Sequence, residues 1–551
     1  MFVTIVLNTE YMDYASRKTW YLKNLLHCKD NGWILITHDY IRKHFDELQD
    51  AILGRIFEQM EMRRFTLDEV KDVEQYFIPD ELFDEIEKTT ESHTTTLLNL
   101  NSKGDKQLYE ILSGIFNQIR EKHPNEKIGG ILHCLEPFES LQTISKELKI
   151  PLIKYSFSAI RKTMGYQQTL YQVNIKENYW NTTEAKGRWE QYGQENHERI
   201  PVFSNEEIIS IIGKEHTLPL IQLISSQPKY EVGICCECYS LTPQTFAKDP
   251  YVDDDIFYEC NQLYPKDKLK VRSHAIHLNT IQVDRSEVHN DPASTILSCK
   301  RTTAVQSQIV LKALLWKRTA VIKKPFIAFS YLCDNDYSSL KIADIEALNY
   351  FIFGYLIPSD LMFSDKYWKW RLTNPTETEI YQRHLDFLFK ALGIDKEKVM
   401  QLQGKERFRY LLECRGCDEQ LIDSLLSDET VENINWDVAS SRFEVVADGK
   451  SKAYWRIDTS NEDGCLTSKL SVKVNNADEV RFYPLDDVAG FARLKSVIIN
   501  GQERELDETM TSFKFMPKTK GSYSFNLEGV FTGMLTIECT WEYKKIFEYL
   551  K

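Results

Sequence analysis

The stretch SCKRTTAVQSQIVLKALLWKRTAVI, residues 298–322, decides the fold that we expect for this chain. It reads as a short β-strand (Thr302–Val305), a polar turn (306–308), a helix with apolar residues at 309, 310, 311, 314 and 315, and a second strand (Thr319–Ile322). A strand, a helix and a second strand in this order make a βαβ unit, in which both strands run parallel. We therefore expect an α/β fold built on parallel sheets.

The polar turn of this unit is a candidate anion site. In a parallel sheet the turn after the first strand and the start of the helix lie at the carboxyl edge, where such sheets bind ligands. Free N–H groups and the positive end of the helix dipole favour a phosphate or a carboxylate there. Ser307 and Gln308 are placed to add side-chain hydrogen bonds. The alternative is a βαβ unit that binds nothing, as in many α/β proteins.

Length and charge bound the class of protein. A chain of 551 residues with 42% hydrophobic residues is expected to hold two to four domains. Its net charge of -14 argues against general nucleic-acid binding, which needs a basic surface. The start, MFVTIVLNTEYMDY, reads as a strand and not as a signal peptide, and no stretch is apolar enough to span a membrane. We expect a cytoplasmic protein.

The C-terminal residues WEYKKIFEYLK leave two interpretations open. They can form a basic amphipathic turn that attaches the protein peripherally to the inner face of the plasma membrane or to an assembly complex. The other interpretation is a frayed terminus.

The cysteines do not indicate a metal centre or a disulfide scaffold. Twelve cysteines in 551 residues are too dilute for disulfide-dependent folding. Two clusters occur, at 235, 236 and 238 and at 414 and 417, but a zinc site usually needs two close-spaced pairs of ligands. We expect no metal and no cofactor.

A first α/β domain is expected over residues 1–228, with a helical insertion at about 40–125. Strand Ile128–Cys134 is followed by a loop in which we place His133 and Glu136. A carboxylate at the carboxyl edge of a sheet can act as a base or a nucleophile. Equally, Glu136 can be a first-turn acid that only complements the helix dipole.

The segment after the next strand, 152–157, adds a second group of candidates in this domain. Arg161 and Tyr166 lie in the sequence SAIRKTMGYQQTLYQ, which concentrates groups able to bind an anion or a sugar hydroxyl.

A second α/β domain is expected over residues 229–435, with a helical end. Its first strand, Val232–Cys236, leads into a loop with Glu237, and a later strand ends in Arg272 and His274. Arg272 and His274 are two residues apart, so they lie on one face of the strand and both reach the sheet edge. Together with the polar turn at 306–308 they favour an anion site.

The C-terminal region, 436–551, has a different pattern. Short runs alternate between apolar and polar residues and are separated by Gly, Asn and Asp turns. Strands of this spacing are typical of an all-β sandwich.

Several stretches resemble bacterial capsule and lipopolysaccharide glycosyltransferases of GT-B fold, the group that includes the Kdo transferases. VRSHA (271–275) resembles the family's strand ending in Arg/Lys-x-His-Pro, and QSQIVLKALLWKRTAVI (306–322) resembles its helix Asn-Ser-Thr-x-Gly-x-Glu-Ala-Leu-x-x-Gly-Lys-Pro-Val. CCECYSLTPQTFAKDPYVDDD (235–255), residues 151–171 and VRFYPLDDVAGFARLKSVIING (480–501) are similar to its second-domain opening, its Arg- and Tyr-containing loop and a terminal β appendage. The chain departs from the family at Ala275, Gln308, Val310, Lys312, Lys317 and Thr319, where the family has Pro, Thr, Gly, Glu, Gly and Pro.

The resemblance implies two Rossmann-like domains in GT-B arrangement and a metal-independent glycosyltransferase. It implies transfer of a sugar from a nucleotide-activated donor, CMP-Kdo in the Kdo group, to a glycan or lipid-linked glycan of the bacterial surface. Glu136 is then the base or nucleophile with His133 beside it. Glu237, Arg272, His274, Ser307 and Gln308 bind the donor, and Arg161 and Tyr166 bind the acceptor or a carboxylate.

Two other functions stay open from the sequence. One is a non-catalytic glycan-binding or assembly scaffold with a degenerate GT-B core, which Val310 and Lys312 favour. The other is a nucleotide-sugar epimerase of the same fold, which needs no acceptor.

Overall fold

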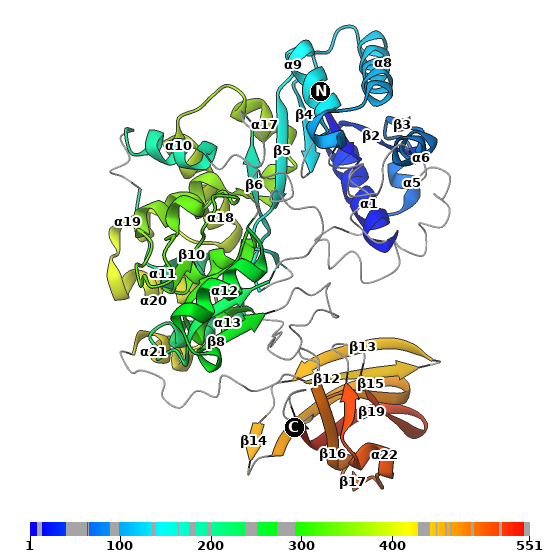
Figure 1. Cartoon of the computed structure of the whole chain (residues 1–551), viewed down its shortest axis with the longest axis vertical. Coiled ribbons are helices and arrows are strands. Elements are labelled where there is room, and N and C mark those ends of the chain that lie inside the picture. The colour runs from blue at the N-terminus through cyan, green and yellow to red at the C-terminus, as the bar shows by residue number, and fades with distance from the viewer. Residues whose placement is uncertain are drawn as a thin grey trace.

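The structure is a computed structural model, and it contains two mainly parallel sheets and one antiparallel sheet (Figure 1). The residues that the structure describes are 1–7, 14–39, 63, 65–88, 99–134, 138–162, 165–175, 183–195, 200–236, 251–272, 292–427, 441–447, 449–457, 460–462, 465–485, 490–516 and 521–544. The expected α/β class is confirmed for the first two sheets.

The first sheet is built mainly from the N-terminal part of the chain. Its strands are β1 (Phe2–Val6), β2 (Ile34–His38), β3 (Gln75–Ile78), β4 (Gly130–Cys134), β5 (Leu152–Phe157), β6 (Leu170–Asn174) and β11 (Ile357–Pro358), in the order β11-β6-β5-β4-β1-β2-β3. The strands from β3 to β5 run parallel, while β6 and β11 are antiparallel to their neighbours. The strand order reverses at β1, the position at which open α/β sheets bind ligands.

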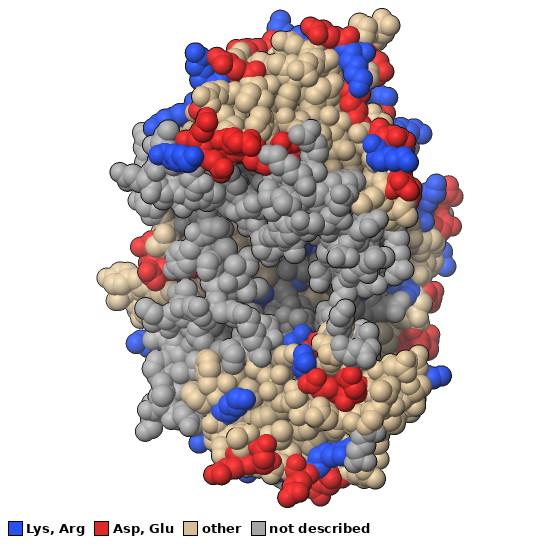
Figure 2. Space-filling model, turned by 90° about the vertical axis from the view of Figure 1, so that its right-hand side faces the viewer, with Lys and Arg blue, Asp and Glu red and all other residues tan. Residues whose placement is uncertain are grey.

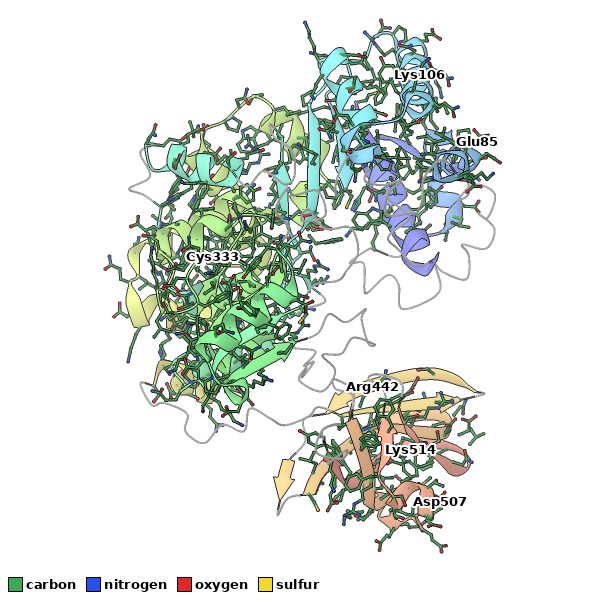
Figure 3. The ribbon with its side chains drawn as sticks, in the orientation of Figure 1. Glu85, Lys106, Cys333, Arg442, Asp507 and Lys514 are labelled. Carbon is green, nitrogen blue, oxygen red and sulfur yellow. The ribbon has the colours of Figure 1, made fainter. Side chains whose placement is uncertain are left out.

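Helices cover both faces of the first sheet. Helix α1 (Tyr14–Asn31) shares one apolar core with β5 and β6. The helices α5 (Leu67–Val70), α6 (Asp80–Lys88), α8 (Lys106–Lys122) and α9 (Glu139–Leu148) complete this part, and α6, α8 and α9 share the core on the opposite face. Glu85 on α6 and Lys106 on α8 point outward into solvent (Figure 3), as expected for the solvated faces of charged helices.

The second sheet contains the βαβ unit that the sequence predicted. Its strands are β7 (Tyr230–Cys235), β8 (Leu269–Arg272), β9 (Cys299–Thr303) and β10 (Thr319–Val321), in the order β10-β9-β7-β8 and all parallel. Between β9 and β10 the predicted helix begins as the 3₁₀ turn η6 (Gln308–Val310) and continues as α14 (Leu311–Leu315). Strand β9 begins and ends earlier than predicted, because Ala304 and Val305 already belong to the turn.

Many helices surround the second sheet. They are α10 (Thr183–Tyr192), α11 (Asn205–Ile212), η3 (Glu215–Leu223), α12 (Asp253–Leu263), η5 (Lys266–Lys268), α13 (Pro292–Leu297), η7 (Ser330–Leu332), α15 (Ile345–Asn349), the π-helix η8 (Tyr350–Tyr355), α18 (Glu377–Leu392), α19 (Lys396–Gln401), α20 (Gly404–Cys414) and α21 (Glu419–Leu426). Helices α19 and α20 are separate, and Gly404 at the start of α20 has a φ of +55°, a left-handed conformation that favours glycine.

The chain returns to the first sheet after the π-helix. Strand β11 pairs with β6, and the helices α16 (Ser359–Met362) and α17 (Asp365–Arg371) follow it. Phe363 and Trp368 pack in the core of α1, and the Asn31 side chain donates to the carbonyl of Phe363 at 2.9 Å. This stretch therefore belongs with the first sheet, whereas the sequence assigned all of 229–435 to the second domain.

The C-terminal region forms a separate antiparallel sheet of eight strands with its own apolar core (Figure 1). The strands are β12 (Ser441–Ala447), β13 (Lys450–Ile457), β14 (Ser460–Glu462), β15 (Cys465–Tyr483), β16 (Gly490–Ile499), β17 (Gln502–Glu503), β18 (Lys514–Met516) and β19 (Tyr523–Lys544), with the short helix α22 (Glu508–Thr511) before β18. Strands β15 and β19 are longer than the short runs of the sequence pattern, and their pairing continues through bulges near Ala477. That this region forms a sandwich stays a prediction.

Within the described residues, none of the helices is long and apolar enough to cross a membrane. The expected cytoplasmic location and the peripheral attachment of the C-terminal residues stay predictions.

A buried histidine predicts how stability depends on pH. His384 on α18 is fully buried; its Nδ1 lies 3.1 Å from the carbonyl of Phe353, and its Nε2 lies 2.7 Å from the Tyr367 hydroxyl. Burial, together with the charges of Arg188 and Arg371, lowers the pKa of His384 to about 3. The ring is therefore neutral. Nδ1–H donates to Phe353 and Nε2 accepts from Tyr367.

We expect acid to destabilise the fold through this residue. Below about pH 6.5 the unfolded chain binds a proton on His384 that the folded chain does not, so stability falls as the pH falls from 6.5 toward 3. The loss from this one side chain is about 2 kcal/mol between pH 7 and pH 5. Urea unfolding at these two pH values should show a smaller difference for His384→Gln than for the wild type. Equal differences would contradict the prediction.

Candidate functional site

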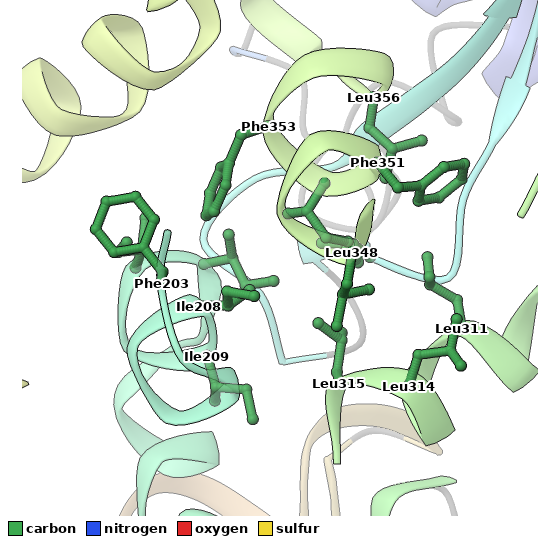
Figure 4. Packing of buried hydrophobic residues seen from close by; sticks show 14 of the residues in the cluster. Phe203, Ile208, Ile209, Leu311, Leu314, Leu315, Leu348, Phe351, Phe353 and Leu356 are labelled. Atoms are coloured by element: carbon green, nitrogen blue, oxygen red, sulfur yellow. The ribbon is translucent and has the colours of Figure 1, made fainter. Parts of the chain in front are cut away.

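The carboxyl edges of the two parallel sheets meet at the loop after β5. Ile160 and Tyr166 of this loop belong to the same apolar core as Leu311 and Leu314 of α14 (Figure 4). The Lys312 ammonium lies 5.0 Å from the centre of the Tyr166 ring, and both side chains are 1% exposed. Because the loop leaves the carboxyl end of β5 and α14 follows the carboxyl end of β9, the two ligand-binding edges are adjacent.

Hydrogen bonds hold the same loop on the segment that leads into the second sheet. The carbonyl of Gly165 accepts from the backbone N–H of Lys214 at 2.8 Å and from the hydroxyl of Thr217 at 2.7 Å. The N–H of Gln167 donates to the carbonyl of Ile212 at 2.8 Å. The junction is therefore fixed by directional bonds as well as by apolar packing.

The cationic groups of Arg161 and Lys23 both lie near the aromatic ring of Phe157 at the end of β5. The Arg161 guanidinium lies 4.6 Å from the centre of the Phe157 ring, and its Nε donates to the carbonyl of Ser158 at 3.0 Å. The Lys23 ammonium lies 5.9 Å from the same ring and donates to the Tyr171 hydroxyl at 2.9 Å. The sequence pointed to Arg161 but not to Lys23, which comes from α1.

His133 does not lie in the loop where the sequence placed it. It is the fourth residue of β4, is 1% exposed, and has Ile5 and Lys154 as its neighbours on the adjacent strands. Its predicted place in the loop is therefore corrected to a buried position within β4, and its role beside Glu136 stays a prediction.

A buried row of polar residues on β5 and β6 escaped the sequence analysis. Lys154, Ser156, Gln172 and Asn174 are cross-strand neighbours on one face of β5 and β6, and we call them the polar stripe. Gln172 Nε2 donates to Ser156 Oγ at 2.6 Å. Strands in the middle of such sheets usually bury apolar residues on both faces. The alternation of polar with apolar residues in LIKYSF and LYQVN is the signal that could have found the stripe.

The second sheet places three of the predicted donor-binding residues at its carboxyl edge. Arg272 is the last residue of β8, is half-buried, and lies beside Cys235 on β7. Ser307 precedes the turn η6 without making a side-chain cap, and Gln308 begins that turn. Among the described residues, Oε1 of Gln308 is buried without a hydrogen-bond partner. Such an atom is costly unless something else binds it.

The remaining predicted residues, Glu136, Glu237 and His274, lie outside the described residues. The roles of all nine predicted site residues stay predictions.

Figure 2 shows one face of the molecule, on which Lys and Arg side chains alternate with Asp and Glu side chains over the described surface. Two cavities have linings made of described residues. One, of about 620 Å³, lies among α11, η3, α20 and α21, and the other, of about 580 Å³, lies between β3 and α8. Neither is lined by a predicted site residue, and we place the candidate site at the carboxyl edges of the two sheets, where Arg161, Arg272 and Gln308 lie.

The described residues contain no group of three or more His, Cys, Asp or Glu side chains that could hold a metal ion. Cys235 and Cys236 of the first cysteine cluster are buried.

Comparisons with known proteins give weak structural likenesses. No family model matches the chain, and no curated protein sequence matches it. Among solved structures, Thermosulfurimonas dismutans KpsC, beta Kdo 2,4 transferase, aligns with 10% identity and a TM-score of 0.26 over 40% of this chain and 78% of that chain. The beta Kdo 2,7 transferase of the same organism's KpsC aligns with 10% identity and a TM-score of 0.29 over 44% and 81%. A UDP-N-acetylglucosamine 2-epimerase aligns with 8% identity and a TM-score of 0.24 over 71% and 96%. Scores this low do not establish a shared fold or function.

Proposed function

We propose that the chain is a glycosyltransferase of GT-B type that moves a sugar from a nucleotide-activated donor to a glycan acceptor. The observation that carries the proposal is the meeting of two parallel-sheet edges at the contact between Tyr166 and α14. One edge supplies Arg161 and the other supplies Arg272, Ser307 and Gln308. Two such edges that face each other offer a donor site and an acceptor site on opposite sides of one reaction centre.

Each candidate residue has a role in this proposal. Arg272, with His274 and Glu237, binds the nucleotide, and Ser307 and Gln308 hydrogen-bond the phosphates. These fixed donors stabilise the charge that develops on the leaving phosphate. Glu136 is the base or the nucleophile, and Arg161 and Tyr166 hold the acceptor or a carboxylate. His133 lies within β4 and holds the carboxyl edge of the first sheet in place.

The finer parts of the proposal follow the family resemblance. They are a CMP-linked donor such as CMP-Kdo, a bacterial surface-glycan acceptor, and catalysis without a metal ion or a cofactor. No membrane segment is required, and a peripheral position at the inner face of the plasma membrane brings the enzyme to a lipid-linked acceptor.

One observation favours the second candidate, a glycan-binding or assembly scaffold. Val310 and Lys312 replace a glycine and a glutamate of the family motif, and both are buried. Lys312 is used for packing on Tyr166, so its ammonium is not displayed to a donor phosphate.

A nucleotide screen separates these two functions. We expect one of CMP, UDP, GDP and dTDP to raise the melting temperature, because a ligand that binds only the folded state adds about 2.7 kcal/mol at a hundred times its Kd. Arg272→Ala should abolish the shift. Arg409→Ala, a control that removes an arginine of α20 paired with Glu419 and Asp423 on α21, should keep it. Folded protein that responds to none of the nucleotides, and whose 440–551 fragment binds oligosaccharide, would instead be a scaffold.

A second test concerns Glu136. In the proposed mechanism Glu136→Gln removes the basic oxygen, so turnover should fall by about a hundredfold or more while nucleotide binding is kept. Glu139→Gln is the matched control, since Glu139 lies in the first turn of α9 and its carboxylate lies 3.9 Å from the Lys146 ammonium of the same helix. Turnover that survives in Glu136→Gln, measured as release of free nucleotide, would exclude Glu136 as base or nucleophile.

A further inference from the structure

The polar stripe meets the segment that carries the chain back from the second sheet to the first. Asn174, at the end of the stripe, accepts a hydrogen bond from the Tyr355 hydroxyl through its Oδ1 at 2.8 Å. Tyr355 is 181 residues further along the chain and is 1% exposed. It is the last residue of the π-helix η8, and β11 begins two residues later and pairs with β6.

The π-helix is held in its unusual form from several sides. The N–H of Leu356 donates to the carbonyl of Phe351 at 3.0 Å, five residues back, which is the bond that defines a π turn. Arg188 Nη2 donates to the carbonyl of Gly354 at 3.3 Å, and the Arg188 guanidinium lies 5.0 Å from the centre of the Tyr355 ring. Arg188 is itself fixed by Glu377 through bonds of 2.9–3.1 Å.

The π geometry of this turn sets the position of all residues that follow it. A π turn contains one residue more than the α turn that it replaces, and such turns are frequent at functional sites. A return to α geometry would shift every following residue by one position. Tyr355 would then leave Asn174, and β11 would change its place on β6. The side chains of the π-helix also pack between α11 and α14, as Phe351 and Phe353 show in Figure 4.

We propose that Asn174 and Tyr355 are positioning residues, whose hydrogen bond fixes the π-helix on the first sheet and so sets the separation of the two carboxyl edges during transfer. The inference rests on the proposed function for its catalytic part. A hydrogen bond is directional, so it selects one placement where an apolar contact would tolerate sliding. The polar stripe supplies the matching polar surface on the first sheet.

Substitutions of single hydroxyl and amide groups test the proposal in the full chain. Tyr355→Phe and Asn174→Leu should each lower kcat by about tenfold or more while KM for the nucleotide-sugar and the melting temperature stay close to the wild type, because a small misplacement of reacting groups lowers kcat. The double variant should lower kcat by less than the product of the two single effects, since both variants remove the same bond. Tyr381→Phe is the matched control: this buried hydroxyl has no hydrogen-bond partner among the described residues, and its loss should change nothing.

Two results would overturn the proposal. One is a kcat of Tyr355→Phe equal to that of Tyr381→Phe. The other is a joint change of kcat, KM and melting temperature, which would show a merely structural contact.

Hydrogen exchange separates failure of this inference from failure of the proposed function. If the wild type turns over no nucleotide-sugar, the proposed function and the catalytic part of the inference both fail. The role of the hydrogen bond between Tyr355 and Asn174 is then tested by the hydrogen-exchange rates of the backbone amides of 351–356 and of β6. They should exchange faster in Tyr355→Phe and in Asn174→Leu than in Tyr381→Phe, and equal rates in all three variants would refute the contact's role.

Discussion

The position of the two parallel sheets depends on the short loop after β5. This loop contacts both the segment before β7 and helix α14. The carbonyl of Gly165 takes two hydrogen bonds from the segment before β7, while Ile160 and Tyr166 are buried against α14. Directional bonds fix the orientation of the loop, and apolar burial supplies most of the stabilising free energy. Any site that uses groups from both sheet edges requires this junction.

Behind the junction lies a buried ionic network that orders the helices around the second sheet. Glu377 binds Arg188, accepts from the Tyr350 hydroxyl at 2.7 Å and lies 4.0 Å from Arg371. Burial alone would raise the pKa of Glu377, but the two guanidinium groups and the hydroxyl hold that pKa below its usual range. Removing one partner from such a buried pair typically costs about 3–5 kcal/mol, because a charge is left without compensation. The network therefore specifies how α10, η8 and α18 fit together.

Local patterns in the sequence predict the local elements well and the distant pairings poorly. Strand 152–157 and the βαβ unit around Ser307 could be predicted because their periodicity is strong. Strand β11 could not, since two residues carry no pattern and their partner strand lies almost 190 positions away. Strand β15 resembles two shorter strands in the sequence, because the two asparagines before Ala477 are typical of a turn, although the strand continues through them as a bulge.

The same reasoning applies to the candidate site. Arg161, Arg272, Ser307 and Gln308 lie at sheet edges because the ends of strands are readable from the sequence. The polar stripe was missed because polar residues on alternate positions are typical of an ordinary strand with one solvated face. Only the tertiary structure shows that this face is covered, in part by Tyr355.

The placement of β11 also has a consequence for synthesis on the ribosome. The edge of β6 stays unpaired until residues 357–358 have emerged, so the nascent first sheet exposes a strand edge while almost two hundred further residues are added.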